Sequence, residues 1–343
     1  MRLKVDPNIG VPKYKQVLSE IESRIMDGTL RKGTHLPSML DIAKDTGMSK
    51  ETVKRALVTL RDRGYISSSP GKGYYVSKDI DELPQKLNIL MIVSSMNIFM
   101  QLLVDSFTMT IKGEAEIKII LHNSDVDQLE YFIDQYCDTY DYYVVVPHFA
   151  IDDHTQMRVA KILGRIPNRK FVMVDFYNRF MSGQFGAVFQ DVYHDPANAL
   201  SEALDELKKV KRLNLVILPR SRYGKIARQS VNSFCDSNGI PFRVLEAFPE
   251  TIEKGEVFLL VTGRLSNALA EFDELVKANG LTLGTDVGLI SYNDVPLNSV
   301  VLGGLTTIST DFVKMGERAA EMVLSGKMRK VHNDFGMIRR KTF

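Results

Sequence analysis

Hydrogen-bonding side chains are concentrated in one short segment, GMSKETVKRALVTLRDRGYI, at residues 47–66. Its lysines, threonines and arginines can bond phosphate oxygens and the edges of nucleic-acid bases. The same segment places Val53, Ala56, Leu57 and Leu60 at helical spacing, so one stripe must face a core. The sequence therefore predicts a helix with one buried face and one face able to contact nucleic acid.

The first turn of this predicted helix carries the chemically useful groups. Lys50 and Lys54 can serve guanine acceptors or phosphates, and Glu51 can accept a hydrogen bond from cytosine N4. Ser49 and Thr52 can bond phosphate oxygens. The alternative is a face charged only for solubility, and the elements around the segment decide between the two interpretations.

Two helices and a hairpin are predicted beside it. Residues 12–26 place apolar side chains three and four apart, and Ser38 is a helix cap three residues before Asp41. That second helix ends at Gly47, and YISSSPGKGYYV at residues 65–76 is typical of strand, tight turn and strand. Three helices and a hairpin with a basic tip indicate a winged helix-turn-helix, which inserts its recognition helix into the major groove.

Residues 12–76 resemble the GntR-type DNA-binding domain, with its LPS, S-x-x-T-V and G-x-G motifs in order. The resemblance implies DNA contacts from the second helix, the first turn of the third helix and the wing. Leu40 stands where the family usually has arginine, so that contact is expected to differ. The DNA-binding residues expected in this sequence are Ser38, Ser49, Lys50, Glu51, Thr52, Lys54, Arg55, Gly71, Lys72 and Gly73.

The distribution of charge supports a division into domains. Residues 1–80 hold 15 basic and 9 acidic side chains, which leaves 29 and 33 for the rest of the chain. A basic head on a mildly acidic body suggests that only the head meets a polyanion. We expect a DNA-binding domain at 1–77, a charged linker KDIDELPQK at 78–86, and a body at 87–343.

The body is predicted to have an α/β fold. Short apolar runs such as LNILMIV, YYVVVPH and LNLVILP alternate with helical runs, which indicates parallel sheets covered on both faces. The number of runs is large enough for two sheets. Ligands of such folds bind at the carboxyl ends of the strands, where this sequence places aromatic, amide and charged side chains. That composition suits a monosaccharide, although polar loop ends are equally expected in any α/β domain.

The segment DVGLISYNDVPLNSVVLGGLTTISTDFVKMGERAAEMVLSG, together with the ending GMIRRKTF, is similar to the C-terminal half of LacI-type regulators. This resemblance implies a two-lobed body like that of periplasmic binding proteins, with an effector in the cleft between lobes. Arg264 departs from the family pattern and hints at an acid or phosphate group. The expected effector-binding residues are Asn97, Phe99, Phe149, Asp175, Phe176, Arg222, Arg228, Arg264 and Asn293.

Signals of catalysis are lacking in the sequence. It contains no G-x-x-x-x-G-K-[ST], H-E-x-x-H or G-x-S-x-G motif, and His122, His148 and His154 follow no metal or triad spacing. We therefore expect lone, solvated loop histidines, no cofactor, no metal and no enzymatic activity. Cys137 and Cys235 are expected to be reduced thiols. The polar start and the short apolar runs predict a cytoplasmic protein with no membrane segment.

The combined expectation is a homodimeric, ligand-responsive transcription factor, most similar to the arabinose-repressor type of regulator. It would repress carbohydrate-utilisation genes at a pseudo-palindromic operator in double-stranded DNA, and a sugar or sugar derivative would relieve repression. Asp195 and Pro196 are expected to cap and begin a helix. Two alternatives stay open: a constitutive DNA-binding protein whose body only dimerises, and a sugar-dependent activator.

Overall fold

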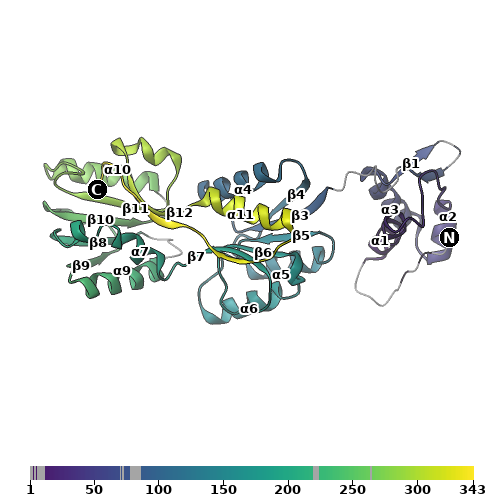
Figure 1. The fold of residues 1–343 in the computed structure, drawn as a ribbon, viewed down its shortest axis with the longest axis horizontal. Coiled ribbons are helices and arrows are strands. Elements are labelled where there is room, and N and C mark those ends of the chain that lie inside the picture. Colours follow the sequence, from purple (N-terminus) through teal and green to yellow (C-terminus); the bar gives the residue numbers. More distant parts are fainter. Residues whose placement is uncertain are drawn as a thin grey trace. The chain divides into compact units, whose positions relative to one another are not determined.

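The chain forms two compact units, residues 1–85 and residues 86–343 (Figure 1). The predicted linker at 78–86 lies outside the described residues except for Lys86. Within the described part of the chain, no helix has the length and apolar character needed to cross a membrane. The computed structural model describes residues 3, 5, 12–69, 71, 73–77, 86–218, 224–262 and 265–343.

The first unit confirms the predicted three helices and hairpin. Its elements are α1 (Lys13–Met26), α2 (Met39–Thr46), α3 (Lys50–Asp62), β1 (Ile66–Ser69) and β2 (Gly73–Val76). The predicted apolar stripe of α3 is fully buried against Val17 and Ile21 of α1. Ser38 and Ser49 accept hydrogen bonds from backbone N–H groups three residues on, and Gly47 ends α2 in the left-handed conformation. Local capping therefore fixes where both helices begin.

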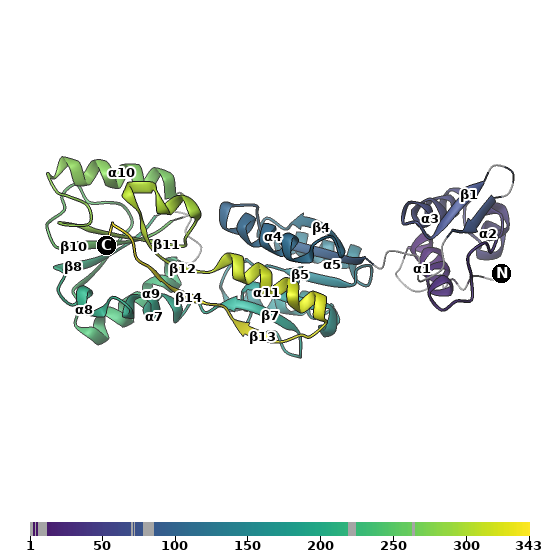
Figure 2. The ribbon, with the colours of Figure 1, turned by 45° about the horizontal axis from the view of Figure 1, so that its top comes forward.

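The second unit contains two six-stranded sheets, and each sheet forms one lobe. The first-lobe sheet has the order β13-β7-β6-β5-β3-β4, with all neighbours parallel. Helices α4 and α11 cover one face of it, and α5 and α6 cover the other (Figure 1). Figure 2 shows α4 and α11 side by side from a second direction. The bounds are β3 (Leu87–Val93), α4 (Ile98–Ile111), β4 (Ala115–Leu121), α5 (Val126–Tyr136), β5 (Tyr142–Val145), α6 (Asp153–Leu163), η2 (Asn168–Lys170), β6 (Phe171–Phe176), β7 (Gly186–Gln190), α11 (Phe312–Ser325) and β13 (Lys330–His332).

The second-lobe sheet has the order β14-β12-β11-β10-β8-β9, in which only the β12–β14 pair is antiparallel. Helices α7, α8 and α9 pack on one face and α10 on the other. The bounds are α7 (Asp195–Ser201), α8 (Leu204–Leu207), β8 (Arg212–Ile217), α9 (Gly224–Asn238), β9 (Phe242–Leu245), β10 (Glu256–Val261), α10 (Leu265–Ala278), β11 (Gly288–Tyr292), η3 (Pro296–Ser299), η4 (Val301–Gly303), β12 (Thr306–Thr310) and β14 (Phe335–Ile338).

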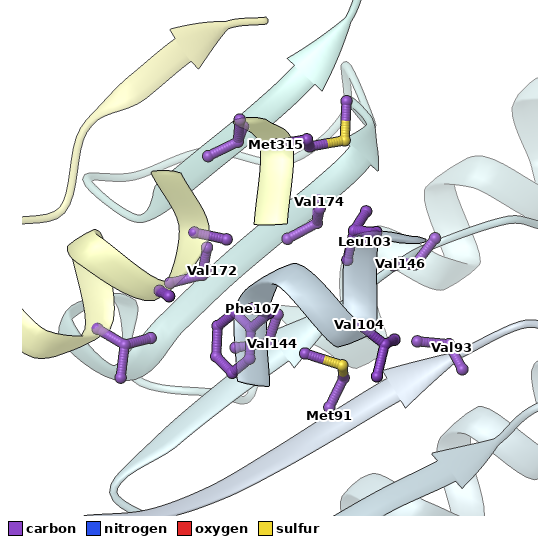
Figure 3. Close-up of a cluster of buried hydrophobic side chains, with 14 of the residues drawn as sticks. Met91, Val93, Leu103, Val104, Phe107, Val144, Val146, Val172, Val174 and Met315 are labelled. Carbon is purple, nitrogen blue, oxygen red and sulfur yellow. The ribbon is translucent and has the colours of Figure 1, made fainter. Parts of the chain in front are cut away.

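The contact between α4 and α11 completes the core of the first lobe. Phe107 and Leu103 of α4 and Met315 of α11 pack on Val144 and Val172 of the sheet (Figure 3). Gly316 makes the close approach possible, because a Cβ at this position would overlap the backbone oxygen of Leu103. In addition, the hydroxyl of Ser106 donates a 2.6 Å hydrogen bond to the carbonyl of Val313.

The chain crosses between the lobes three times. Crossover 1, residues 191–194, joins β7 to α7; crossover 2, residue 311, joins β12 to α11; crossover 3, residues 333–334, joins β13 to β14. The last part of the chain therefore returns to the first lobe before it ends in the second. Such an interleaved chain places three short connecting segments between the two lobes.

Three local predictions were incomplete. The helical run PANALSEALDELKKV at residues 196–210 was expected to be one helix, but it divides into α7 and α8. The apolar runs were expected to be mostly buried, but β4, formed by the run IKIIL and the two residues before it, is the edge strand of its sheet and has only half-buried and exposed residues. Strand β13 was not predicted, because three residues with largely exposed side chains carry no periodic signal.

Candidate functional sites

The first turn of α3 presents its polar side chains to solvent. Lys50, Glu51 and Lys54 are exposed, and Ser49 and Thr52 are tied by a 2.8 Å hydrogen bond between their hydroxyls. Lys54 lies 3.9 Å from Glu51, and both side chains are more than half exposed, so this ion pair contributes little to stability. The ammonium group of Lys54 and the carboxylate of Glu51 can therefore separate and bind a ligand at a small cost in free energy.

Other predicted DNA-binding residues have structural contacts as well. The hydroxyl of Ser38 caps α2 and donates a 2.6 Å hydrogen bond to Asp41. The guanidinium of Arg55 lies 4.1 Å from the centre of the Tyr14 ring, so it joins α3 to α1. Leu40, at the position of the family arginine, is 64% exposed. An apolar side chain therefore faces solvent where the resemblance leads us to expect a cation.

The wing is a tight hairpin. Strands β1 and β2 pair from Ile66–Val76 to Ser69–Gly73. Gly71 and Gly73 both have a φ of +77°, a conformation that residues with a Cβ rarely adopt. Lys72, predicted at the tip of the wing, lies outside the described residues.

In the second unit, a hydrogen-bonded chain forms where first-lobe strands end. His148 Nε2 lies 2.7 Å from Asp175 Oδ2, and Gln190 Nε2 donates to Asp175 Oδ1 over 2.5 Å. Ser94 Oγ lies 3.4 Å from His148 Nδ1. Because an ionised carboxylate only accepts hydrogen bonds, His148 Nε2 is the donor to Asp175. The parallel order of β3, β5, β6 and β7 brings these side chains together.

Two of the predicted effector residues have unusual backbone conformations. Asp175 has a φ of +73° and Asn293 a φ of +69°. Residues other than glycine rarely occupy this region, and where they do, the surrounding structure must hold them there. Asp175 is held by His148 and Gln190, and the N–H of Asn293 donates to the carbonyl of Ile308. Both are therefore candidates for a functional role.

In the part of the chain that the structure describes, buried polar atoms without a hydrogen-bond partner occur in Gln190, which bonds to Asp175, and in Tyr292 and Asn293. Burial raises the pKa of the Tyr292 hydroxyl above its usual range, and the carboxylates of Asp175 and Asp195 raise it further. The Tyr292 hydroxyl is therefore a neutral group close to both carboxylates. Among the described residues, it has no hydrogen-bond partner, nor do Oε1 of Gln190 and Oδ1 of Asn293. Buried polar atoms without partners are costly, so this region is ready to accept water or a ligand.

The remaining predicted effector residues are dispersed. Asn97 caps α4, with its side-chain oxygen accepting from Met100 N at 2.9 Å. Phe99 is half-buried beside Phe312, with ring centroids 5.5 Å apart. Arg228 is an exposed residue of α9.

The other two predicted aromatic residues are buried. Phe149 stacks on His122 at 4.3 Å, whereas Phe176 packs with Val192 and Ile226. Arg222 and Arg264 lie outside the described residues.

The expectation of solvated histidines was wrong for two of them. His122 is fully buried: its Nε2 lies 3.0 Å from the carbonyl of Val146, and its Nδ1 accepts from Ser124 N. The His148 side chain is only 11% exposed and pairs with Asp175. The missed signal is that His122 follows the apolar run IKIIL and His148 follows YYVVVP, so both lie just beyond the carboxyl end of a strand. No three His, Cys, Asp or Glu side chains among the described residues could together hold a metal ion.

Asp195 does not cap α7 as predicted. It is the first residue of that helix, and its buried carboxylate accepts from Asp191 N at 2.7 Å and from His332 Nε2 at 3.0 Å. Burial raises the pKa of the Asp195 carboxyl, an effect that the bond to His332 opposes. Because His332 ends β13, this pair joins crossovers 1 and 3.

Comparison with known proteins supports the description of both units. Residues 13–76 match a family described as bacterial regulatory proteins, gntR family. The chain is 30% identical over 76 residues to the HTH-type transcriptional repressor NagR of Bacillus subtilis. The aligned residues are 22% of this chain and 31% of NagR. It is 34% identical over 68 residues to the arabinose metabolism transcriptional repressor of Geobacillus stearothermophilus, 20% of this chain and 19% of that protein. The match thus spans less than a third of either relative.

The second unit has its own structural neighbours. The Lac repressor dimer bound to operator and the anti-inducer ONPF aligns with a TM-score of 0.57 at 16% identity, over 75% of this chain and 94% of that chain. A GntR-type helix-turn-helix precedes a LacI-like, two-lobed body. At this identity the likeness to the Lac repressor establishes the fold of the body and not its ligand.

Proposed function

We propose that the chain is a DNA-binding transcriptional regulator, a homodimeric cytoplasmic repressor of carbohydrate-utilisation genes that a monosaccharide or derivative releases from DNA. The observation that carries the proposal is the first turn of α3, where exposed lysines follow a capped start within a segment that matches the gntR family. Two relatives are named as repressors, NagR and the arabinose metabolism repressor, which supports repression rather than activation. The domain bounds proposed are 1–77, 78–86 and 87–343.

The ligand is proposed to bind between the lobes, at Asp175, Asn293 and their neighbours. A ligand that contacts both lobes favours the lobe arrangement in which those contacts form, and so shifts the equilibrium toward it. If this arrangement binds DNA less well, the ligand lowers operator affinity, and the operator lowers ligand affinity by the same factor.

Operator recognition is tested by selecting duplexes from a random library with the purified protein. We expect a pseudo-palindromic site to be enriched, since a two-fold dimer reads two half-sites. Lys54→Ala should weaken binding to that duplex and lower the slope of log affinity against log salt by about one if a phosphate contact is lost. Titration of labelled duplex at several salt concentrations measures both quantities.

Lys277→Ala, on α10 of the body, is the matched control, because it also removes one exposed lysine. Equal losses of affinity for the duplex in Lys54→Ala and Lys277→Ala would show that only net charge matters, and would contradict recognition by α3.

Effector binding is tested by thermal unfolding of the whole protein with neutral monosaccharides, uronic acids and sugar phosphates. A ligand present at 100 times its dissociation constant should add roughly 2.7 kcal/mol of stability. If the whole panel produces no shift, the alternative of a body that only dimerises gains support.

The proposed dimer surface lies on the first lobe. On α4, Ile98 and Met109 are 52% and 74% exposed, and eleven residues separate them, which places them on one side of the helix. On the edge strand β4, Ile119 and Leu121 are 38% and 39% exposed and share a face with Ile117, which packs on the α4–α11 core. These exposed apolar residues form a surface that a second copy of the chain could cover.

Met109→Glu is expected to shift the protein from dimer to monomer, because a buried unpaired carboxylate is strongly unfavourable at an apolar interface. Sedimentation velocity measures the change. Met157→Glu, on α6 at the opposite face of the sheet, is the control and should remain dimeric. A Met109→Glu protein that remains dimeric would place the interface elsewhere.

A further inference from the structure

Asn333 lies in crossover 3 and is 1% exposed. Its side-chain nitrogen donates to Thr310 Oγ1 at 2.9 Å and to the carbonyl of Asp311 at 2.8 Å. Its side-chain oxygen accepts from Arg318 Nη1 at 2.7 Å. One amide therefore bonds the end of a second-lobe strand, crossover 2 and a first-lobe helix.

The backbone around Asn333 strengthens this connection. The N–H of Asn333 donates to the carbonyl of Phe189 at 2.7 Å, which holds crossover 3 against β7 of the first lobe. The N–H of Asp311 donates to the carbonyl of Asp334 at 3.1 Å, and Thr310 Oγ1 donates to the same carbonyl. Crossovers 2 and 3 are thus bonded to each other at several points.

Crossover 1 is held differently. Asp195, the first residue after crossover 1, bonds to His332, the last residue before crossover 3, and the His332 side chain is 51% exposed. Water can replace a bond of this kind more readily than the buried bonds of Asn333. The bonds that join crossovers 2 and 3 at Asn333 are therefore the more deeply buried.

We propose that Asn333 is a positioning residue that clamps crossovers 2 and 3 into one pivot, about which the lobes rotate while crossover 1 adjusts. Its regulatory meaning rests on the proposed function: a ligand between the lobes moves them along one defined path only while the pivot is intact. The chemistry at position 333 is restrictive, because the site needs two donors and one acceptor in a side chain of this length. Aspartate has the same shape but places an acceptor against the carbonyl of Asp311.

The test measures the distance between lobes in full-length protein without ligand or DNA. Spin labels are placed at Met157→Cys on the first lobe and Lys277→Cys on the second, in a protein with Cys137→Ser and Cys235→Ser. Double electron–electron resonance then gives the distribution of label separations. We expect Asn333→Asp to lose the narrow distribution of the parent protein and to give a broad one.

Arg318→Ala is the second variant, since this side chain, which is 27% exposed, belongs to no apolar core, and its loss should also broaden the distribution. Asn238→Ala, which loses a single bond to its own helix at Phe234, is the control and should stay narrow. A distribution as narrow as the parent in both Asn333→Asp and Arg318→Ala overturns the proposal. This result does not depend on ligand or operator, so it is separate from any failure of the proposed function.

A second readout links the pivot to regulation. With a sugar identified by the thermal panel, Asn333→Asp should still bind the sugar but should no longer release the selected duplex. If Asn333→Asp no longer binds the sugar, or if the sugar still releases the duplex from it, Asn333 does not couple sugar binding to DNA release.

Discussion

Asp175→Ala is expected to lower the affinity of the inter-lobe site for its ligand by about 100-fold, or on the order of 3 kcal/mol. The carboxylate of Asp175 accepts from both His148 and Gln190, so its removal leaves two buried donors without their acceptor. The imidazole then loses its acceptor, and the acceptor geometry that the Asp175 carboxylate offers to a ligand is lost. DNA binding without ligand should be unchanged.

The affinity is measured by titration calorimetry with the sugar that the thermal panel identifies. Asp175→Asn should give a smaller loss, because one side-chain oxygen still accepts and asparagine tolerates a positive φ better than alanine. Asp127→Ala removes an 81% exposed carboxylate from α5 of the same lobe and should have no effect. Full affinity in Asp175→Ala would remove this residue from the site.

Gly316→Ala is expected to destabilise the body by about 3 kcal/mol, the upper part of the usual range for overpacking a core. The added methyl group would overlap the carbonyl of Leu103 and lie 2.9 Å from the backbone nitrogen of Phe107. Both are backbone atoms of α4, so the helix itself must move. For a domain of this size, the corresponding loss in Tm is roughly 6–12 °C.

Differential scanning calorimetry of the whole chain tests this expectation. Glu317→Ala is the matched control: it lies one position on in α11 with its side chain exposed, and should change stability by less than about 0.5 kcal/mol. An unchanged Tm for Gly316→Ala would show that α4 and α11 are not in such close contact.

The helices of the first unit could be predicted because their signals are local. Ser38 and Ser49 cap helices within three residues, and the buried stripe of α3 repeats with the period of the helix. The alternation of strands and helices in the body likewise follows from apolar runs. Rules that act over a few residues were sufficient for these elements.

The proposed site between the lobes depends on strand order, which no local pattern contains. His148 and Asp175 meet because β5 and β6 are neighbours, and Ser94 joins them because β3 lies beside β5. Asn97 and Phe149 have suitable chemistry, but one caps a helix and the other is buried against His122. Residue type therefore indicated the region, whereas the sheet topology determined which side chains come together.

The interleaved path of the chain has a consequence for the order of assembly on the ribosome. Strands β3 to β7 emerge early, but α11 and β13, which complete the same lobe, emerge only after residues 195–310 of the second lobe. Until then, Phe107 and Val172 lack the cover of Met315. Domains commonly fold in the order of synthesis. Here the second lobe, which lacks only β14 and residues 339–343 at that stage, can close before the first, and the newly made first lobe is the part whose uncovered apolar surface favours aggregation.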